Sequence, residues 1–116
     1  MTEKQLQNEI VRVFGTRPDL RLWRQNTGVA VYAGRGPGDI RRVRFGVPGQ
    51  ADLTGILPGG VRLEIEVKGP HGRQSDDQRA YQQIIERFGG VYVLAYSLAD
   101  VWAALKPYGI KQGSTP

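Results

Sequence analysis

The segment from residue 51 to residue 68, ADLTGILPGGVRLEIEVK, constrains the fold more strongly than any other part of the chain. Two apolar-rich runs, 51–57 and 61–68, flank Pro58-Gly59-Gly60, and this arrangement predicts an antiparallel hairpin with a tight turn. Successive side chains of a strand point to opposite faces of the sheet. One face of the second run is therefore aliphatic and carries Leu63, Ile65 and Val67. The opposite face is charged and carries Arg62, Glu64, Glu66 and Lys68.

The chain as a whole predicts one α/β domain over residues 1–110, with a flexible C-terminal tail over 111–116. Two capping boxes, Thr2 with Gln5 and Ser75 with Gln78, open helices over about 3–14 and 76–88. Ser97 caps a third helix, which reaches about Lys106. Further strand patterns cover residues 20–26, 29–33, 41–45 and 90–96. This order of elements predicts a mixed β-sheet flanked by helices.

Apolar residues inside these elements predict which side chains form the core. The apolar stripe of the first helix comprises Leu6, Ile10, Val13 and Phe14. The second helix is expected to bury Tyr81, Ile84, Ile85 and Phe88. In the strand over 20–26, Trp23 is expected to point inward.

Composition excludes several classes of protein and points weakly to one kind of partner. The chain has no cysteine, which removes disulfides, thiol nucleophiles and zinc–thiolate sites. No apolar run approaches the ~20 residues needed to cross a bilayer, and the N-terminus does not have the pattern of a signal peptide. The net charge is +5, and 12 of the 16 cationic residues are arginine, the better donor to phosphate. The charge therefore favours nucleic acid as a partner, although only weakly.

Asp52 begins the run that is expected to pair with 61–68, and its carboxylate is expected to face the same side as that of Glu66. Two such carboxylates suit Mg²⁺, which prefers oxygen ligands and commonly takes one or two carboxylates from the protein. An ion held there lowers the pKa of a bound water and neutralises charge on a phosphodiester. Lys68, on the same face, is placed to orient that water or to stabilise developing negative charge. The alternative is a half-exposed strand whose charged face is solvated and forms cross-strand pairs.

Five segments, in order along the chain, carry a resemblance to one family. They are Glu9 in the first helix, Arg24-Gln25-Asn26-Thr27-Gly28, Gly49-Gln50-Ala51-Asp52-Leu53, Glu66-Val67-Lys68, and the set Gly72, Ser75, Gln78 and Tyr81. Together they resemble the virus-type replication-repair nuclease (VRR-NUC) family of the PD-(D/E)xK nuclease superfamily. Two departures do not put the metal site in doubt: Ala51 precedes Asp52 where the family has proline, a common variation of the motif, and Tyr81 stands where tryptophan is frequent, which concerns packing more than chemistry.

The resemblance implies a restriction-endonuclease-like core in the order α-β-β-β-α-β-α and hydrolysis of phosphodiester bonds that depends on Mg²⁺ or Mn²⁺. By this resemblance, the metal ligands are Asp52, Glu66, the main-chain carbonyl of Val67 and, directly or through water, Glu9. Lys68 would position the attacking water or stabilise the transition state, and Gln78 would support the site from its helix.

Two of these residues have an equally good structural explanation. Gln78 is also the capping-box partner of Ser75, and both roles are compatible. Glu9 can equally be an ordinary exposed acidic residue of the first helix, without a role in the site. Glu64, by contrast, is expected to be structural, as an ion-pair partner of Arg62.

Arginines that are expected to contact DNA cluster in and after a glycine-rich loop over 34–39, namely Arg35, Arg41, Arg42 and Arg44. Phosphate contacts from such residues give salt-dependent, sequence-independent affinity; the alternative is a solvated, positively charged hairpin. Other residues expected to lie near DNA are Arg24, Asn26, Arg73 and Arg79.

By the resemblance, the protein is a homodimeric endodeoxyribonuclease of the stand-alone phage or bacterial type, located in bacterial or phage-infected host cytoplasm. Its expected substrate is branched DNA such as Holliday junctions. Two alternatives stay open: a non-catalytic DNA-binding module on the same fold, and a nuclease that acts on duplex DNA or RNA.

Overall fold

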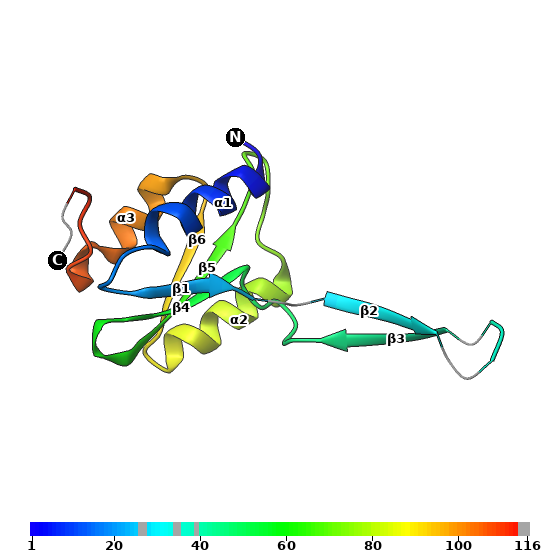
Figure 1. The fold of residues 1–116 in the computed structure, drawn as a ribbon. Helices are drawn as coiled ribbons and strands as arrows, with labels where there is room; N and C mark the ends of the chain where they lie inside the picture. Colours follow the sequence, from blue (N-terminus) through cyan, green and yellow to red (C-terminus); the bar gives the residue numbers. More distant parts are fainter. Residues whose placement is uncertain (26–27, 34–35, 39, 114–116) are drawn as a thin grey trace.

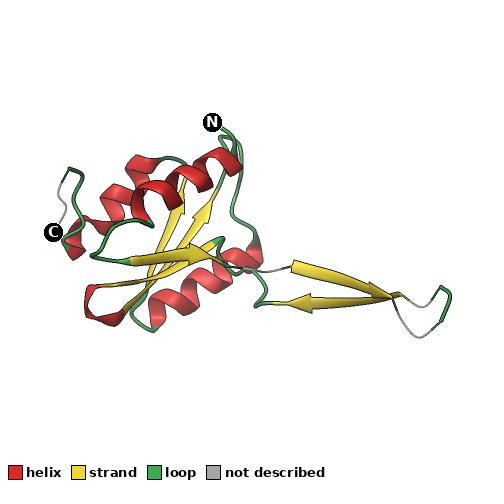
Figure 2. Cartoon of the chain, in the orientation of Figure 1, coloured by secondary structure: helices red, strands yellow, loops and turns green. Residues whose placement is uncertain are grey.

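A computed structural model describes residues 1–25, 28–33, 36–38 and 40–113, and over 28–33 and 40–45 it describes the backbone alone. The fold is a central four-stranded sheet with helices on both faces, from which a two-stranded hairpin projects (Figures 1 and 2). The helices are α1 (Glu3–Phe14), α2 (Asp76–Arg87) and α3 (Leu98–Leu105). The strands are β1 (Arg21–Arg24), β2 (Gly28–Ala33), β3 (Ile40–Phe45), β4 (Leu53–Leu57), β5 (Val61–Val67) and β6 (Val91–Ala95). Short 3₁₀ turns cover Pro58–Gly60 and Lys106–Tyr108.

The central sheet has the strand order β1-β4-β5-β6 and is mixed. β4 is antiparallel to both β1 and β5, which confirms the hairpin predicted around Pro58-Gly59-Gly60. β6 lies parallel to β5, and α2 connects the two strands. The predicted mixed sheet is therefore confirmed, with β5 in its interior.

β2 and β3 form a separate two-stranded antiparallel sheet, which we call the β2–β3 arm (residues 28–45). The register runs from Gly28 opposite Phe45 to Ala33 opposite Ile40, so the strands predicted over 29–33 and 41–45 are present and pair with each other. The arm points away from the body of the protein (Figure 1), and the molecule measures 57 × 31 × 28 Å along its principal axes. β2 and β3 thus form their own sheet and do not extend the central one. The strand patterns in the sequence do not distinguish these two arrangements.

Local sequence signals account for the helix ends. Thr2 and Ser75 each accept a hydrogen bond from the backbone N–H three residues later, and the side chain of the glutamine there accepts one from the backbone N–H of the cap residue. Both predicted capping boxes are therefore present. Ser97 accepts from the backbone N–H of Asp100 and caps α3. These bonds satisfy N–H groups that a helix start otherwise leaves without partners.

The core has two layers, one on each face of the central sheet. The larger layer lies between the sheet and the helices α1 and α3, and it includes Ile10, Phe14, Leu63, Ile65, Val67, Val101 and Leu105. The smaller layer lies under α2 and consists of Ala51, Tyr81, Ile85 and Tyr92, with Leu94 packed against it. The aliphatic face of β5 thus belongs to the larger layer, as the alternation of its sequence predicts.

Three predictions of burial are wrong. Ile84 on α2 is 48% exposed and Phe88, just past its end, is 81% exposed, because the apolar face that α2 buries carries Tyr81 and Ile85. Trp23 is 49% exposed. Trp23 lies opposite Thr54 and therefore on the face of the sheet that α2 covers, but at the edge strand, where the cover ends. Its neighbour Leu22 enters the larger layer instead.

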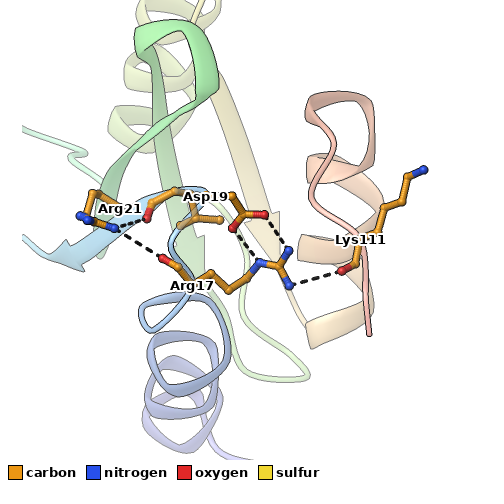
Figure 3. Close-up of polar contacts among 5 residues, drawn as sticks. Arg17, Asp19, Arg21 and Lys111 are labelled. Atoms are coloured by element: carbon orange, nitrogen blue, oxygen red, sulfur yellow. Dashed lines mark hydrogen bonds and ion pairs between the residues drawn. The ribbon is translucent and has the colours of Figure 1, made fainter. Parts of the chain in front are cut away.

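A buried arginine joins the start of the domain to its end (Figure 3). The Arg17 guanidinium donates two parallel hydrogen bonds to Asp19, of 2.9 and 2.7 Å, and a third of 3.3 Å to the carbonyl of Lys111. It also lies 5.7 Å from the centre of the Trp102 ring, a cation–π distance. Residue 111, which the sequence assigns to the tail, is thus tied to the α1–β1 connection, while residues 114–116 lie outside the described part.

Within the described residues, no helix is long and apolar enough to cross a membrane.

Candidate active site

The carboxyl groups of Asp52 and Glu66 meet where β4 begins and β5 ends. The β4–β5 ladder pairs Leu53 with Ile65, so the residues just outside this pair, Asp52 and Glu66, lie opposite each other. Asp52 Oδ2 accepts a hydrogen bond of 2.9 Å from the backbone N–H of Val67, which fixes the Asp52 side chain against β5. The structure therefore brings together the two acids that the sequence predicts to face the same side.

Burial gives Glu66 an unusual acidity. Its side chain is 2% exposed, and burial raises the pKa of Glu66 to about 9. That value also includes a hydrogen bond with Asp52 and the negative charge of that residue, which raise the pKa, and the positive charge of Lys68, which lowers it. Because its pKa lies above neutral pH, Glu66 holds a proton there that a bound cation would replace.

Gln78 holds Glu66 and caps α2 with the same side chain. Its Nε2 donates a hydrogen bond of 2.9 Å to Glu66 Oε2, while its Oε1 accepts one of 2.8 Å from the backbone N–H of Ser75. The predicted cap is therefore present, and the same side chain also contacts Glu66, a contact that its expected supporting role requires. The helix cap thereby fixes the position of the amide that contacts the buried carboxyl group.

Lys68 follows Val67 directly and lies partly buried at the same end of β5. Its backbone N–H donates a hydrogen bond of 3.0 Å to the carbonyl of Ala95 in β6. Its side chain packs closely along Gly72, where an added Cβ would lie 3.2 Å from Lys68 Cβ and Cδ. The ammonium group is near enough to Glu66 to lower the pKa of that residue, as described above.

The predicted acid of α1, Glu9, does not join this group in the structure. Its carboxylate pairs with Arg12 one turn later, and a hydrogen bond from that residue lowers the pKa of Glu9. Among the described residues, no three histidine, cysteine, aspartate or glutamate side chains gather at one point. A different acid of α1 lies nearer: the charge of Glu3 raises the pKa of Glu66. The backbone N of Glu3 is also 4.0 Å from the Cβ position of Gly69, just past β5.

The charged face of β5 is not the solvated face that the alternative reading of the sequence describes. Glu64 is fully buried, with 0% of its surface exposed. Arg62 lies at the surface and approaches it, with 3.6 Å between Arg62 Nε and Glu64 Oε2, so the predicted ion pair is present. Tyr81 and Gln25 donate hydrogen bonds to Glu64 Oε1, the latter at 2.9 Å.

Gln25 is the contact residue that sequence reasoning missed. It lies inside the segment Arg24–Gly28, where only Arg24 and Asn26 were singled out. The buried charge at Glu64 is the one signal that points to it, because a carboxylate without exposure needs donors. Nothing in the linear sequence connects two residues 39 positions apart.

The described residues expected to contact DNA lie in four places. Arg24, at the end of β1, donates a hydrogen bond of 2.6 Å to Asn8 of α1. Arg79 bonds to Asp76 and to the carbonyl of Gln74 at the start of α2. Arg73 lines an open cavity of about 370 Å³ together with Pro70, His71, Gly72 and Tyr96. Arg41, Arg42 and Arg44 belong to β3 of the arm, whereas Arg35 and Asn26 lie outside the described residues.

The donor set at the end of β5 fits a hard divalent cation. Asp52, Glu66 and the main-chain carbonyl of Val67 are all oxygen donors, the type that Mg²⁺ and Mn²⁺ prefer. Two carboxyl groups in hydrogen-bond contact, one of them buried with a raised pKa, form a site that a cation neutralises. The chain has no cysteine to supply a thiolate for a softer metal.

A mixed sheet flanked by three helices, with these groups at one end of two strands, is consistent with a restriction-endonuclease-like core. The model of the VRR-NUC domain family matches residues 2–99, a range that includes Asp52, Glu66, Lys68 and Gln78. The chain belongs to the VRR-NUC family, which confirms the resemblance read from the sequence and indicates a nuclease. A nuclease domain implies DNA as the substrate. Comparison with curated proteins and with solved structures gives no match.

Proposed function

We propose that the protein is a divalent-metal-dependent endodeoxyribonuclease whose active site comprises Asp52, Glu66, Lys68 and Gln78. The observation that carries this proposal is the position of Asp52, which the Val67 N–H holds against β5, opposite the buried Glu66 and beside Lys68. Two acids held against each other are costly for a protein that only binds DNA, because they repel phosphate as well as one another. The arrangement is favourable once a cation lies between the acids and the phosphate.

Each residue has a distinct task in this proposal. Asp52, Glu66 and the Val67 carbonyl hold Mg²⁺ or Mn²⁺, which when bound lowers the pKa of a water and neutralises charge on the phosphodiester. Lys68 lies beside the same carboxyl groups, where its ammonium group orients the attacking water or stabilises the negative charge that develops on phosphate. Gln78 keeps the Glu66 carboxyl group in position through its 2.9 Å hydrogen bond. Glu9 would contribute only through water, since its carboxylate is already paired with Arg12.

Cleavage of labelled DNA with and without added Mg²⁺ or Mn²⁺ tests this proposal. Asp52→Asn and Lys68→Ala should each reduce cleavage by at least about 100-fold, and a chelator should abolish it in the wild-type protein. Asp77→Asn and Lys106→Ala, at exposed positions, are the matched controls and should keep full activity. Wild-type cleavage that continues unchanged in a chelator would refute the metal requirement.

The rival function, a non-catalytic DNA-binding module, predicts a different result for the same variants. A binding module would never cleave DNA under any metal condition, and it would tolerate both Asp52→Asn and Lys68→Ala. For a nuclease, these variants should lose cleavage and keep most of the affinity for DNA, because the arginines of the arm lie elsewhere in the fold. Measuring binding and cleavage on one labelled DNA separates the two functions.

The preference for branched DNA and the homodimer are part of the proposal and come from the family resemblance. A two-fold dimer would present two active sites to two strands of a junction. Light scattering should then give twice the chain mass of 12.8 kDa. Cleavage of a four-way junction should exceed that of a linear duplex or an RNA of the same sequence. Equal cleavage of junction and duplex would remove the junction preference while leaving the nuclease proposal intact.

A further inference from the structure

Both ends of the β2–β3 arm are attached to the body through a pair of glutamines. Gln25 precedes the arm, and Gln50 follows it after the connecting loop over 46–50. The Gln50 Nε2 donates a hydrogen bond to the Gln25 Oε1 across the base of the arm. Gln50 Oε1 accepts a further bond of 3.1 Å from the backbone N–H of Val47. The side chains of this pair therefore join the outgoing chain to the returning chain.

The glutamine pair is anchored on the buried carboxyl group of Glu64. Gln25 Nε2 donates a hydrogen bond of 2.9 Å to Glu64 Oε1 and another of 3.1 Å to the carbonyl of Ala51. Tyr81 of α2 donates to the same carboxylate oxygen, and burial raises the pKa of Tyr81 to about 12, so its hydroxyl keeps the donated proton. Since Glu64 is in the interior strand of the sheet and is fully buried, this anchor belongs to the rigid part of the fold.

The same base of the arm also contacts the elements that carry the active site. The backbone N–H of Gln25 donates a hydrogen bond of 2.9 Å to the carbonyl of Asp52. Gly49 lies directly against the first turn of α2: its φ is +78°, and an added Cβ would come within 2.1 Å of the Asp77 carbonyl. That turn also carries Gln78, which holds Glu66. The base of the arm and the two carboxyl groups are thus parts of one contact network.

The length of the arm makes its direction sensitive to this attachment. Each strand of the arm has six residues and, at ~3.3 Å per residue, extends ~20 Å from the base. A rotation of ~10° at the base would move the tip by ~3.5 Å, about one base-pair step of DNA. A loose attachment would therefore change which phosphodiester reaches the active site when the arm is bound to DNA.

We propose that Glu64, Gln25 and Gln50 are positioning residues that fix the direction of the β2–β3 arm relative to Asp52 and Glu66. On a DNA substrate, this fixed direction sets the distance between the point where the arm binds and the phosphodiester that is cut. The second statement rests on the proposed nuclease function, whereas the first concerns the geometry of the protein alone. Glu64 needs no contact with DNA or metal for this role.

The geometric part can be tested without DNA or metal. The chain has no cysteine, so spin labels at Gly36→Cys near the arm tip and Glu86→Cys on α2 give one distance distribution. Gln25→Ala and Gln50→Ala should shift or broaden this distance distribution. Glu64→Gln keeps an acceptor oxygen for Gln25 and should therefore give a distribution close to that of the wild-type protein. The control Gln112→Ala, at an exposed position, should leave it unchanged.

Thermal unfolding of each labelled variant shows whether it is folded. If Gln25→Ala does not fold, Gln50→Ala, which lies in a surface loop, tests by itself whether the glutamine pair fixes the direction of the arm. Wild-type distributions in both folded glutamine variants would overturn the proposal.

The functional part is tested by mapping cut positions on an end-labelled junction. Wild-type protein should cut at a narrow set of phosphodiesters, and Gln50→Ala should spread the cuts over neighbouring positions. A positional spread is a readout that a loss of stability alone would not produce. If the wild-type protein does not cleave DNA at all, the nuclease proposal fails, while the distance measurement still decides the role of the glutamine pair. Unchanged cut positions in an active Gln50→Ala protein would overturn the link to cleavage.

Discussion

Gln78 and Glu66 are joined by a hydrogen bond of 2.9 Å between Nε2 and Oε2, and the other end of the same amide caps α2 at Ser75. One side chain thus connects the stability of a helix start to the position of a buried carboxyl group. The two contributions can be separated, since the cap uses the amide oxygen and the contact with Glu66 uses the amide nitrogen.

Ser75→Ala removes half of the capping box and leaves the amide of Gln78 free to contact Glu66. It should lower the free energy of unfolding by about 1 kcal/mol with little effect on cleavage. Gln78→Glu keeps an oxygen for the cap but replaces the donor to Glu66 by a third carboxylate, so cleavage should fall by about 10- to 100-fold. Urea unfolding and cleavage rates of both variants check this. An equal loss of activity in both would show that the cap alone matters.

The raised pKa of Glu66 predicts how the stability of the metal-free protein depends on pH. The carboxyl group has a pKa of about 9 in the folded protein and an ordinary value of 4.5. The folded state therefore binds the proton more tightly than the unfolded state, so this contribution to stability is complete below about pH 4.5 and is lost as the pH rises through about 9. Urea unfolding in the presence of a chelator should therefore give a free energy of unfolding that falls as the pH rises across this range.

Glu66→Gln should remove most of this slope, because an amide does not titrate. Glu86→Gln, an exposed glutamate on α2, serves as the control and should keep the slope of the wild-type protein. Added Mg²⁺ should stabilise the wild-type protein more at the alkaline end, because metal binding requires the deprotonated carboxylate. A slope that persists unchanged in Glu66→Gln would contradict the assignment to this residue.

Arg17 is expected to be more important for stability than any surface arginine. Its guanidinium is buried, pairs with Asp19 through two hydrogen bonds and binds the carbonyl of Lys111 (Figure 3). Arg17→Ala leaves Asp19 without its partner and should cost about 2 kcal/mol or more. Arg17→Lys should recover little of this, because an ammonium group cannot form the two parallel bonds. Arg12→Ala, in the exposed pair with Glu9, is the control in the same thermal unfolding experiment and should change stability far less.

The arginines of β3 should determine the salt dependence of DNA binding. If Arg41, Arg42 and Arg44 each neutralise a phosphate, replacing all three by alanine should reduce the slope of log K against log salt by about 0.9 for each contact. Affinity should fall similarly for every sequence tested, because phosphate contacts do not read bases. Fluorescence anisotropy in a chelator measures this without cleavage, and Arg87→Ala on α2 is the control. An unchanged slope in the triple variant would assign the phosphate contacts to other residues.

Short-range signals in the sequence predict most of the elements. The capping boxes at Thr2 and Ser75 place two helix starts correctly, because a cap involves residues only three positions apart. The β4–β5 hairpin follows from the turn residues and two adjacent runs. The opposition of Asp52 and Glu66 follows from that hairpin in turn. This half of the site is therefore predictable, since both acids lie on neighbouring strands joined by a three-residue turn.

Other features of the site depend on contacts between distant segments. The strand register places Trp23 and Glu64 on the same face of the sheet, yet Trp23 is half exposed and Glu64 is fully buried. The difference arises because α2 packs over β5 and not over the edge strand β1, and no local pattern encodes where a helix will lie. For the same reason, no local pattern connects Gln25 to Glu64, and Gln78 was linked to the site of Glu66 only through the family resemblance.

The sequence alone determined the chemistry available at the end of β5. It places Glu66 and Lys68 on one face of their strand, Asp52 on the same side of the neighbouring strand, and an aliphatic face behind them. It did so because the two-residue period of a strand and the short turn between β4 and β5 are local properties. Only the tertiary structure decided which of the charged side chains are buried, which amides hold them, and that the β2–β3 arm stands apart from the sheet. The burial and the amide contacts depend on the packing of α2 against β5 and β6, a long-range contact that sets the environment of Glu64 and Glu66.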